Sequence, residues 1–203
     1  MSDLVIEALA QELGPLGLRR SGQEFRRHTE SGDGIVVAYR EVDWYKGYSA
    51  FYIDVGLISV PWLEWVTHAE QPVRPEDATV DHAFGHYQVG ALLQAQPWIL
   101  RADNAPEVLA TMRTKVSALV REYLPLLDRA VLIDKLRSHE GIGGVINKRG
   151  GLLILLASRG IDHEFVELFS AFKTKPEWLD WIWNYAVRNT PPGTAIPPRP
   201  TPP

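Results

Sequence analysis

The 203-residue chain contains no cysteine. This absence excludes disulfide bonds, thiolate metal ligands and a cysteine nucleophile, and it suits a reducing compartment. The chain also lacks any apolar run near the ~20 residues that cross a bilayer, and its first thirteen residues are acidic, unlike the basic start of a signal peptide. We therefore expect a cytoplasmic protein that is neither secreted nor inserted in a membrane.

Basic charge is scarce in the first half of the chain. Residues 1–60 carry nine acidic and six basic side chains, and residues 61–100 carry five acidic and one basic. Residues 101–203 carry fourteen basic and eleven acidic side chains. Binding to a nucleic-acid backbone depends on clustered Lys and Arg, so this pattern argues against a nucleic-acid partner. An acidic surface favours a basic protein partner instead.

The patterning that is present indicates an α+β fold with an N-terminal helix and an antiparallel sheet. Apolar residues at helical spacing predict a helix over 3–13. Alternating apolar and polar residues predict two antiparallel strands over 35–42 and 49–58, joined by a turn at Lys46–Gly47. A sheet of four to six strands is expected, with the remaining strands drawn from 23–28, 84–93 and 97–100.

The second half of the chain shows the 3.6-residue period of helices. Asp103 or Asn104 suits the N-cap of a long helix that ends at Pro125, and Pro125 is expected to open the next helix. Three more helices are expected over 152–157, 162–172 and 176–188. In the last of these we expect Trp183 to point away from the core. The residues expected to face inward after Pro125 are Leu126, Leu127, Ala130, Val131 and Ile133.

These elements predict three regions. Residues 1–102 would form the helix-plus-antiparallel-sheet unit, and residues 103–190 would form a helical region packed on or beside it. Residues 191–203 contain seven prolines, which predicts a disordered, polyproline-like tail.

Three segments carry a family resemblance. The runs LGPLGLRRSGQEFRR from Leu13, GIVVAYR from Gly34 and FYIDVGL from Phe51 resemble the uncharacterised bacterial family called domain of unknown function 4304. The resemblance covers about residues 1–125. It implies a bacterial protein with an α+β fold, and it supplies no reaction because the family has no established activity. Proteins of similar size and build occur among bacterial immunity proteins, which suggests an immunity-like role by analogy. The departures from the family pattern are Leu18, Tyr39 and Arg40.

Asp81, His82 and His86 form the densest group of possible ligands. Residues four apart share a face of a helix or a strand, so the two histidines can converge on a metal ion or act with Asp81 as an oriented base. A catalytic zinc site needs about three protein ligands, and no nearby motif supplies the third. We therefore expect ordinary surface or hydrogen-bonded histidines, with no metal and no cofactor.

Asp54 interrupts an otherwise apolar strand, and Arg40 lies at a comparable position in the neighbouring strand. The simpler interpretation is a cross-strand ion pair worth under ~1 kcal/mol. The alternative is a polar pair that lines a ligand-binding cleft together with Tyr39, Tyr52 and Trp62.

Two basic segments need interpretation. The glycine-rich run 141–151, with Lys148 and Arg149, fits neither phosphate-loop spacing and is expected to be a flexible connector. Arg19–Arg20 and Arg26–Arg27 alternate across a strand, so they are expected to be solvated charges at the sheet edge.

Two functional hypotheses follow. In the first, a non-enzymatic protein presents an acidic, aromatic surface that includes Trp62 and Trp65 to a basic protein partner. In the second, an enzyme or a small-ligand or metal-binding protein uses a cleft over the sheet. We favour the first, because the sequence shows no recognisable catalytic triad, phosphate loop or complete metal set. The cleft residues of the second are Asp54, Asp81, His82 and His86.

Overall fold

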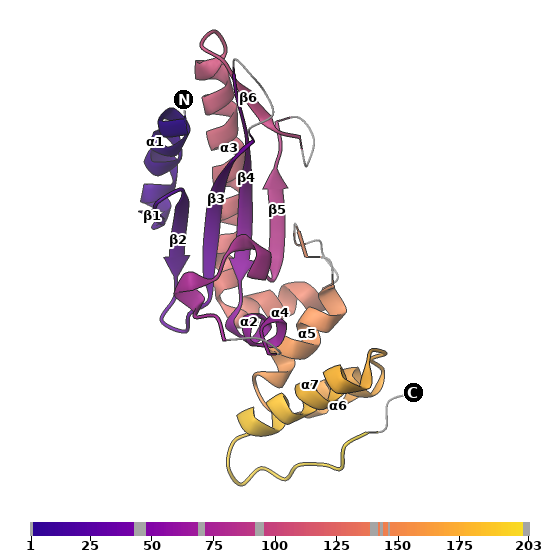
Figure 1. Ribbon diagram of the computed structural model, residues 1–203. Helices are drawn as coiled ribbons and strands as arrows, with labels where there is room; N and C mark the ends of the chain where they lie inside the picture. The colour runs from indigo at the N-terminus through magenta and orange to yellow at the C-terminus, as the bar shows by residue number, and fades with distance from the viewer. Residues whose placement is uncertain are drawn as a thin grey trace. The chain divides into compact units, whose positions relative to one another are not determined.

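The computed structural model describes residues 2–42, 48–68, 72–91, 96–138, 142, 144–145 and 147–200. These residues form seven α-helices and a six-stranded antiparallel sheet, which confirms the expected α+β class (Figure 1). The turn predicted at Lys46–Gly47 lies outside the described residues. Among the residues described, no helix combines the length and the apolarity needed to cross a membrane.

The chain divides into two compact units. The first comprises Met1–Asp128 together with Ile142–Val145, and the second comprises Arg129–Gly141 and Ile146–Pro203. The long helix α3 (Ala105–Tyr123) therefore belongs with the sheet. The boundary that the sequence suggested at residue 102 falls inside the first unit, because α3 packs against β4 and β6 rather than among the later helices.

The sheet of the first unit runs in the order β1-β2-β3-β4-β5, and β6 also pairs with β4. Both β5 and β6 use the same partner: Leu57 of β4 lies opposite Gly85, and Ser49 lies opposite Leu100. The bounds are β1 Arg19–Ser21, β2 Glu24–His28, β3 Gly34–Val42, β4 Ser49–Ile58, β5 Gly85–Val89 and β6 Trp98–Leu100.

One face of the sheet is covered by helices. Helix α1 (Ser2–Leu13) and α3 pack against each other, and α3 lies along the strands (Figure 1). Successive residues of a strand point to opposite faces, so alternate β4 residues supply this core. The fully buried core side chains include Leu9, Ile53, Val55, Leu57, Val116 and Val120.

The other face is covered at the end where β4 finishes. Helix α2 (Val60–Val66) and the 3-10 turns η2 (Pro75–Asp77) and η3 (Val80–His82) pack there. Gly56 permits this approach, because a Cβ at Gly56 would come within 3.0 Å of the Ala83 Cβ. The apolar cluster beneath consists of Val36, Ile58, Leu63 and Ala78, with Val73, Val80 and Ala83 packed against it. Nearer to Arg40 of β3 and Asp54 of β4, the side chains on the same face are polar.

The chain around Pro125 differs from the expectation. Pro125 lies in the 3-10 turn η4 (Leu124–Leu127), and helix α4 begins only at Arg129. The turn changes the helical phase, so α4 buries Leu132, Ile133 and Leu136. The inward positions predicted for Ala130 and Val131 were therefore wrong, since both are exposed.

The second unit is built around the apolar helix α5. Helices α4 (Arg129–Arg137), α6 (His163–Ser170) and α7 (Pro176–Asn189) all pack against α5 (Lys148–Ala157). Buried residues occur along almost all of α5, as expected for a core helix.

Trp183 on α7 is buried, contrary to the expectation that it points outward. Its ring lies 5.9 Å from that of Phe165 and 5.3 Å from that of Phe169, between ring centroids. Residues 191–200 contain neither helix nor strand, as expected for a proline-rich segment. Arg199 nevertheless contacts α7, because its Nη1 lies 2.6 Å from Oδ1 of Asp180.

Candidate functional site

A cluster of polar side chains lies on the sheet face opposite α1 and α3, with Asp54 at its centre. Asp54 is buried, and Gln88 donates to its Oδ1 at 3.2 Å. His86 Nε2 lies 3.1 Å from the same oxygen, and Arg40 Nη2 lies 3.4 Å from Oδ2. Three side chains thus satisfy a carboxylate that would be costly to bury alone.

Strand register explains this convergence. Ala38 and Gln88 lie directly opposite Asp54 on β3 and β5. Arg40 and His86 each lie two residues along those strands, so they occupy diagonal positions on the same face. The cross-strand pair predicted between Arg40 and Asp54 is therefore present.

The outer part of this polar cluster is accessible to a ligand. The Arg40 side chain is 60% exposed, and its guanidinium lies over the Tyr52 ring at 5.1 Å. The imidazole of His86 is 40% exposed. Because Asp54 engages Nε2 at 3.1 Å, the carboxylate orients the His86 ring.

The backbone of His86 is fixed from the outer edge of β5. Its N–H donates to the carbonyl of Gly144 at 3.3 Å. Gly144 has φ +77°, and a Cβ there would overlap the His86 backbone, so glycine is required for this approach. The segment expected to be a flexible connector is thus hydrogen-bonded to β5, the strand that carries His86.

Asp81 and His82 do not join this cluster. The Nδ1 of His82 accepts from the Thr79 N–H at 3.2 Å and lies 3.0 Å from the Thr79 hydroxyl, which closes the turn η3. Asp81 is exposed on the same turn. His82 ends η3 and His86 lies in β5, so the face-sharing assumed for residues four apart does not apply. Within the described ranges, no three His, Asp or Glu side chains are grouped to hold a metal ion.

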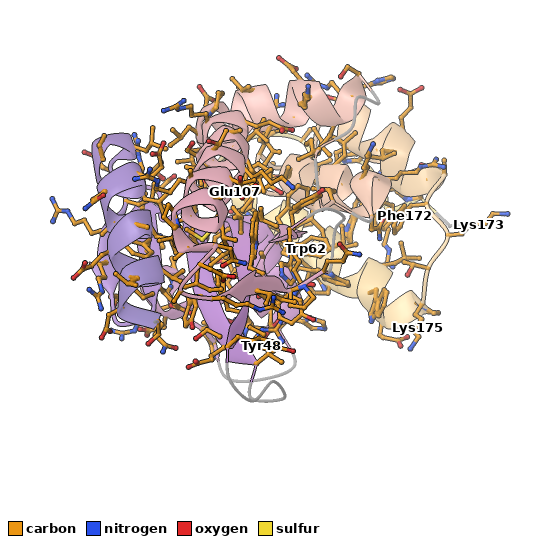
Figure 2. All side chains as sticks on the ribbon, turned by 90° about the horizontal axis from the view of Figure 1, so that it is seen from above. Tyr48, Trp62, Glu107, Phe172, Lys173 and Lys175 are labelled. Carbon is orange, nitrogen blue, oxygen red and sulfur yellow. The ribbon has the colours of Figure 1, made fainter. Side chains whose placement is uncertain are left out.

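Trp62 and Trp65 belong to α2, beyond the end of β4, rather than to the polar cluster. The Trp62 ring, labelled in Figure 2, meets Phe84 edge-on at 5.4 Å. The Trp65 ring stacks on His68 at 5.0 Å. Of the aromatic residues that the sequence placed around a cleft, Tyr52 lies beside the polar cluster and Trp62 lies on α2, whereas Tyr39 is buried opposite Ile53 on the core face of the sheet.

Sequence reasoning missed Gln88 and Gly144. Gln88 lies two residues after His86 in β5, on the same face of the sheet. Knowledge of the β4–β5 register would therefore have placed Gln88 opposite Asp54. The pairing of Gly144 with β5 joins residues 58 positions apart and has no local signal beyond the glycine itself.

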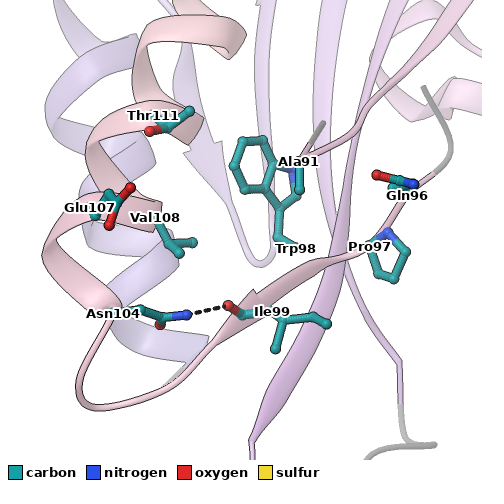
Figure 3. Close-up of a pocket in the computed structure, with 9 residues that line it drawn as sticks. All are labelled: Ala91, Gln96, Pro97, Trp98, Ile99, Asn104, Glu107, Val108 and Thr111. Atoms are coloured by element: carbon teal, nitrogen blue, oxygen red, sulfur yellow. Dashed lines mark hydrogen bonds between the residues drawn. The ribbon is translucent and has the colours of Figure 1, made fainter. Parts of the chain in front are cut away.

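A separate hollow of about 580 Å³ lies between β6 and the first turns of α3 (Figure 3). The indole of Trp98 lines it, and Asn104 closes one side by donating from Nδ2 to the Ile99 carbonyl at 3.1 Å. Glu107 is the one ionisable side chain among the described residues that line it. A lone carboxylate offers no acid–base pair, so this hollow is a weaker site than the polar cluster.

Comparison of the chain with protein-family models, curated proteins and solved structures finds no match. The resemblance to domain of unknown function 4304 stays a prediction.

Proposed function

We propose that the protein is a non-enzymatic protein-interaction module, immunity-like in role, whose acidic and aromatic surface binds a basic partner protein. The observation that carries this proposal is the outward stripe of α2, formed by Trp62, Trp65 and Val66. Positions three and four apart lie close together on a helix surface, and Leu63 of the same helix enters the core.

The stripe has the composition of a binding surface. Val66 is 38% exposed and both tryptophan side chains are partly exposed. Aromatic side chains that are apolar and only partly covered are enriched among the anchors of protein interfaces. The carboxylates of Glu64 and Asp81 are exposed nearby, because α2 and η3 pack over the same apolar cluster. Glu76 and Asp77 are exposed on η2.

The test is affinity capture with the purified, immobilised full chain. At ~0.05 M salt, where surface charges are weakly screened, we expect a basic protein to bind and to be released at ~0.5 M salt. The variants Trp65→Ala and Glu64→Lys should each abolish its capture. The control is Trp178→Ala, which removes a tryptophan that is 38% exposed on α7. Equal capture by all variants, or the absence of any salt-sensitive partner, contradicts the proposal.

A second candidate function rests on His86 and Asp54. A buried carboxylate that orients a half-exposed imidazole is the arrangement that prepares a histidine for proton transfer. In this alternative the polar cluster binds a small molecule, with Arg40 and Tyr52 beside it. NMR titration of the His86 ring signals against millimolar carboxylates, phosphate and divalent cations tests this: a saturable shift that Asp54→Asn abolishes supports it. Unchanged ring signals throughout exclude it.

A further inference from the structure

A basic groove lies at the sheet edge where the end of α1 meets β1 and β2. Its volume is about 680 Å³, and it is bordered on one side by the turn η1 (Gly14–Leu16). Four arginines line it, and none of the described lining residues is acidic. The sequence suggested scattered edge charges, but the fold gathers Arg19, Arg20, Arg26 and Arg27 around one hollow.

Strand pairing brings like charges together in this groove. Arg19 of β1 lies directly opposite Arg26 of β2. Like charges directly opposite each other in an antiparallel pair destabilise a sheet. Among the described residues, Arg26 is the one of the four with an ion pair, which it forms with Glu24, and its Nη1 also donates to the carbonyls of Glu76 and Ala78.

Neutral backbone acceptors orient two of the other three guanidinium groups without cancelling their charge. Arg27 donates from Nη1 to the Leu16 carbonyl at 2.7 Å, and Arg20 donates from Nε to the Gly22 carbonyl at 3.0 Å. Arg27 also lies against Gly17, where a Cβ would come within 3.1 Å of its Nη1. Each such bond uses one of five N–H donors, so the planar groups remain able to bind an anion.

We propose that this groove binds the phosphate group of a small phosphorylated molecule. Guanidinium groups bind phosphate through paired, charge-assisted hydrogen bonds, and a doubly charged phosphate would balance the positive charges of Arg19, Arg20 and Arg27. The volume lies within the ~300–1,000 Å³ typical of small-molecule sites. This site is independent of the acidic surface on α2.

The surroundings favour a small ligand over a nucleic-acid strand. The described lining residues include no Phe, Tyr or Trp on which a base would stack. The first hundred residues also carry more acidic than basic side chains, which disfavours a long polyanion.

The test uses inorganic pyrophosphate as the probe, with binding to the full chain followed by calorimetry at ~0.15 M salt. We expect saturable binding that weakens at least about tenfold in Arg19→Gln and in Arg27→Gln. The matched control is Arg121→Gln, which removes an arginine that is 64% exposed on α3 of the same unit and should leave the affinity unchanged. Arg19 is exposed on the edge strand, so its variant is expected to fold and circular dichroism checks this.

Three results would overturn the proposal. The first is no saturable binding at millimolar pyrophosphate. The second is equal affinity in Arg19→Gln and in Arg121→Gln. The third is tighter binding of a single-stranded oligonucleotide than of pyrophosphate, since that would identify the groove as a backbone-tracking surface.

Discussion

Asp54 and Arg40 lie on one face of the β3–β4 hairpin at diagonal positions, with 3.4 Å between carboxylate and guanidinium, yet the two side chains differ sharply in burial. The Asp54 side chain is 3% exposed and that of Arg40 is 60% exposed. The pair is therefore asymmetric: water solvates Arg40 in the absence of its partner, whereas Asp54 depends on protein donors.

This asymmetry predicts unequal effects of mutation. Arg40→Ala should lower the free energy of unfolding by under ~1 kcal/mol, because Gln88 and His86 still satisfy the carboxylate. Asp54→Ala should cost ~2–3 kcal/mol, because it leaves a cavity and removes the acceptor of three side chains. Urea denaturation measures both values. Equal losses in the two variants would contradict the asymmetry.

Gly144→Ala should strongly destabilise the first unit. An alanine must adopt φ +77° and also displace the His86 backbone, so we expect a loss above ~2 kcal/mol. Gly193→Ala is the control, since Gly193 has φ +84° but open space around its Cβ position. Gly193→Ala should lower the free energy of unfolding by only ~1 kcal/mol, the cost of placing alanine at a positive φ. Denaturation midpoints compare them, and equal losses would show that close approach to His86 is unimportant.

Tyr39 should make stability fall at alkaline pH. Burial, with the nearby charge of Glu41, raises the pKa of Tyr39 from 10.0 to about 12. The unfolded chain ionises first, so stability is full below pH ~10 and declines by roughly 2–3 kcal/mol as pH rises to ~12.

Tyr39→Phe should flatten much of this decline, although burial also raises the pKa of Tyr123 and some slope remains. At neutral pH the variant should be as stable as the parent or more so, because the buried Tyr39 hydroxyl has no partner among the described residues. Unfolding followed from pH 7 to 11.5 gives the measurement. Tyr52→Phe, at a half-buried position, should keep the slope. A parent-like decline in Tyr39→Phe would refute the assignment.

Glu164 should make the second unit sensitive to acid. Arg137 on α4 donates to it from Nε at 2.7 Å and from Nη2 at 2.5 Å, and these bonds lower the pKa of Glu164 from 4.5. Its stabilisation is present above pH ~4.5 and is lost as pH falls through the lowered pKa. Because both side chains are 39% exposed, the effect should stay under ~1 kcal/mol.

Glu164→Gln should reduce that acid dependence in thermal unfolding between pH 3 and 6. The control Glu177→Gln, at an exposed position on α7 of the same unit, should leave it unchanged. Identical pH profiles for all three proteins would exclude the contribution of Glu164.

Local patterns predicted most of the fold. The alternation in β3 and β4 gave their pairing, and the Arg40–Asp54 contact follows from it. Helical phase was less predictable. For α4, the 3-10 turn at Pro125 moved the inward face to Leu132 and Leu136. For α7, Trp183 lies inward because its ring packs against Phe165 and Phe169 of α6. The sequence of α7 alone does not contain this contact.

The candidate site was predicted only in part, because tertiary pairing completes it. Asp54, Arg40 and His86 were all identified from the sequence, but His82 was grouped with His86 and the donor Gln88 was missed. The arginine groove was also missed, since the facing of Arg19 and Arg26 depends on the β1–β2 register.

The chain passes between its two compact units three times, and the brief return at 142–145 has a practical consequence. Ile142 and Val145 are buried, and the Gly144 carbonyl receives the His86 N–H. A shortened protein ending at Asp128 would keep the strands β1 to β6. It would also expose the free edge of β5, and exposed edge strands promote self-association. A separately expressed first unit therefore has to include the segment 142–145, joined to the chain that ends at Asp128.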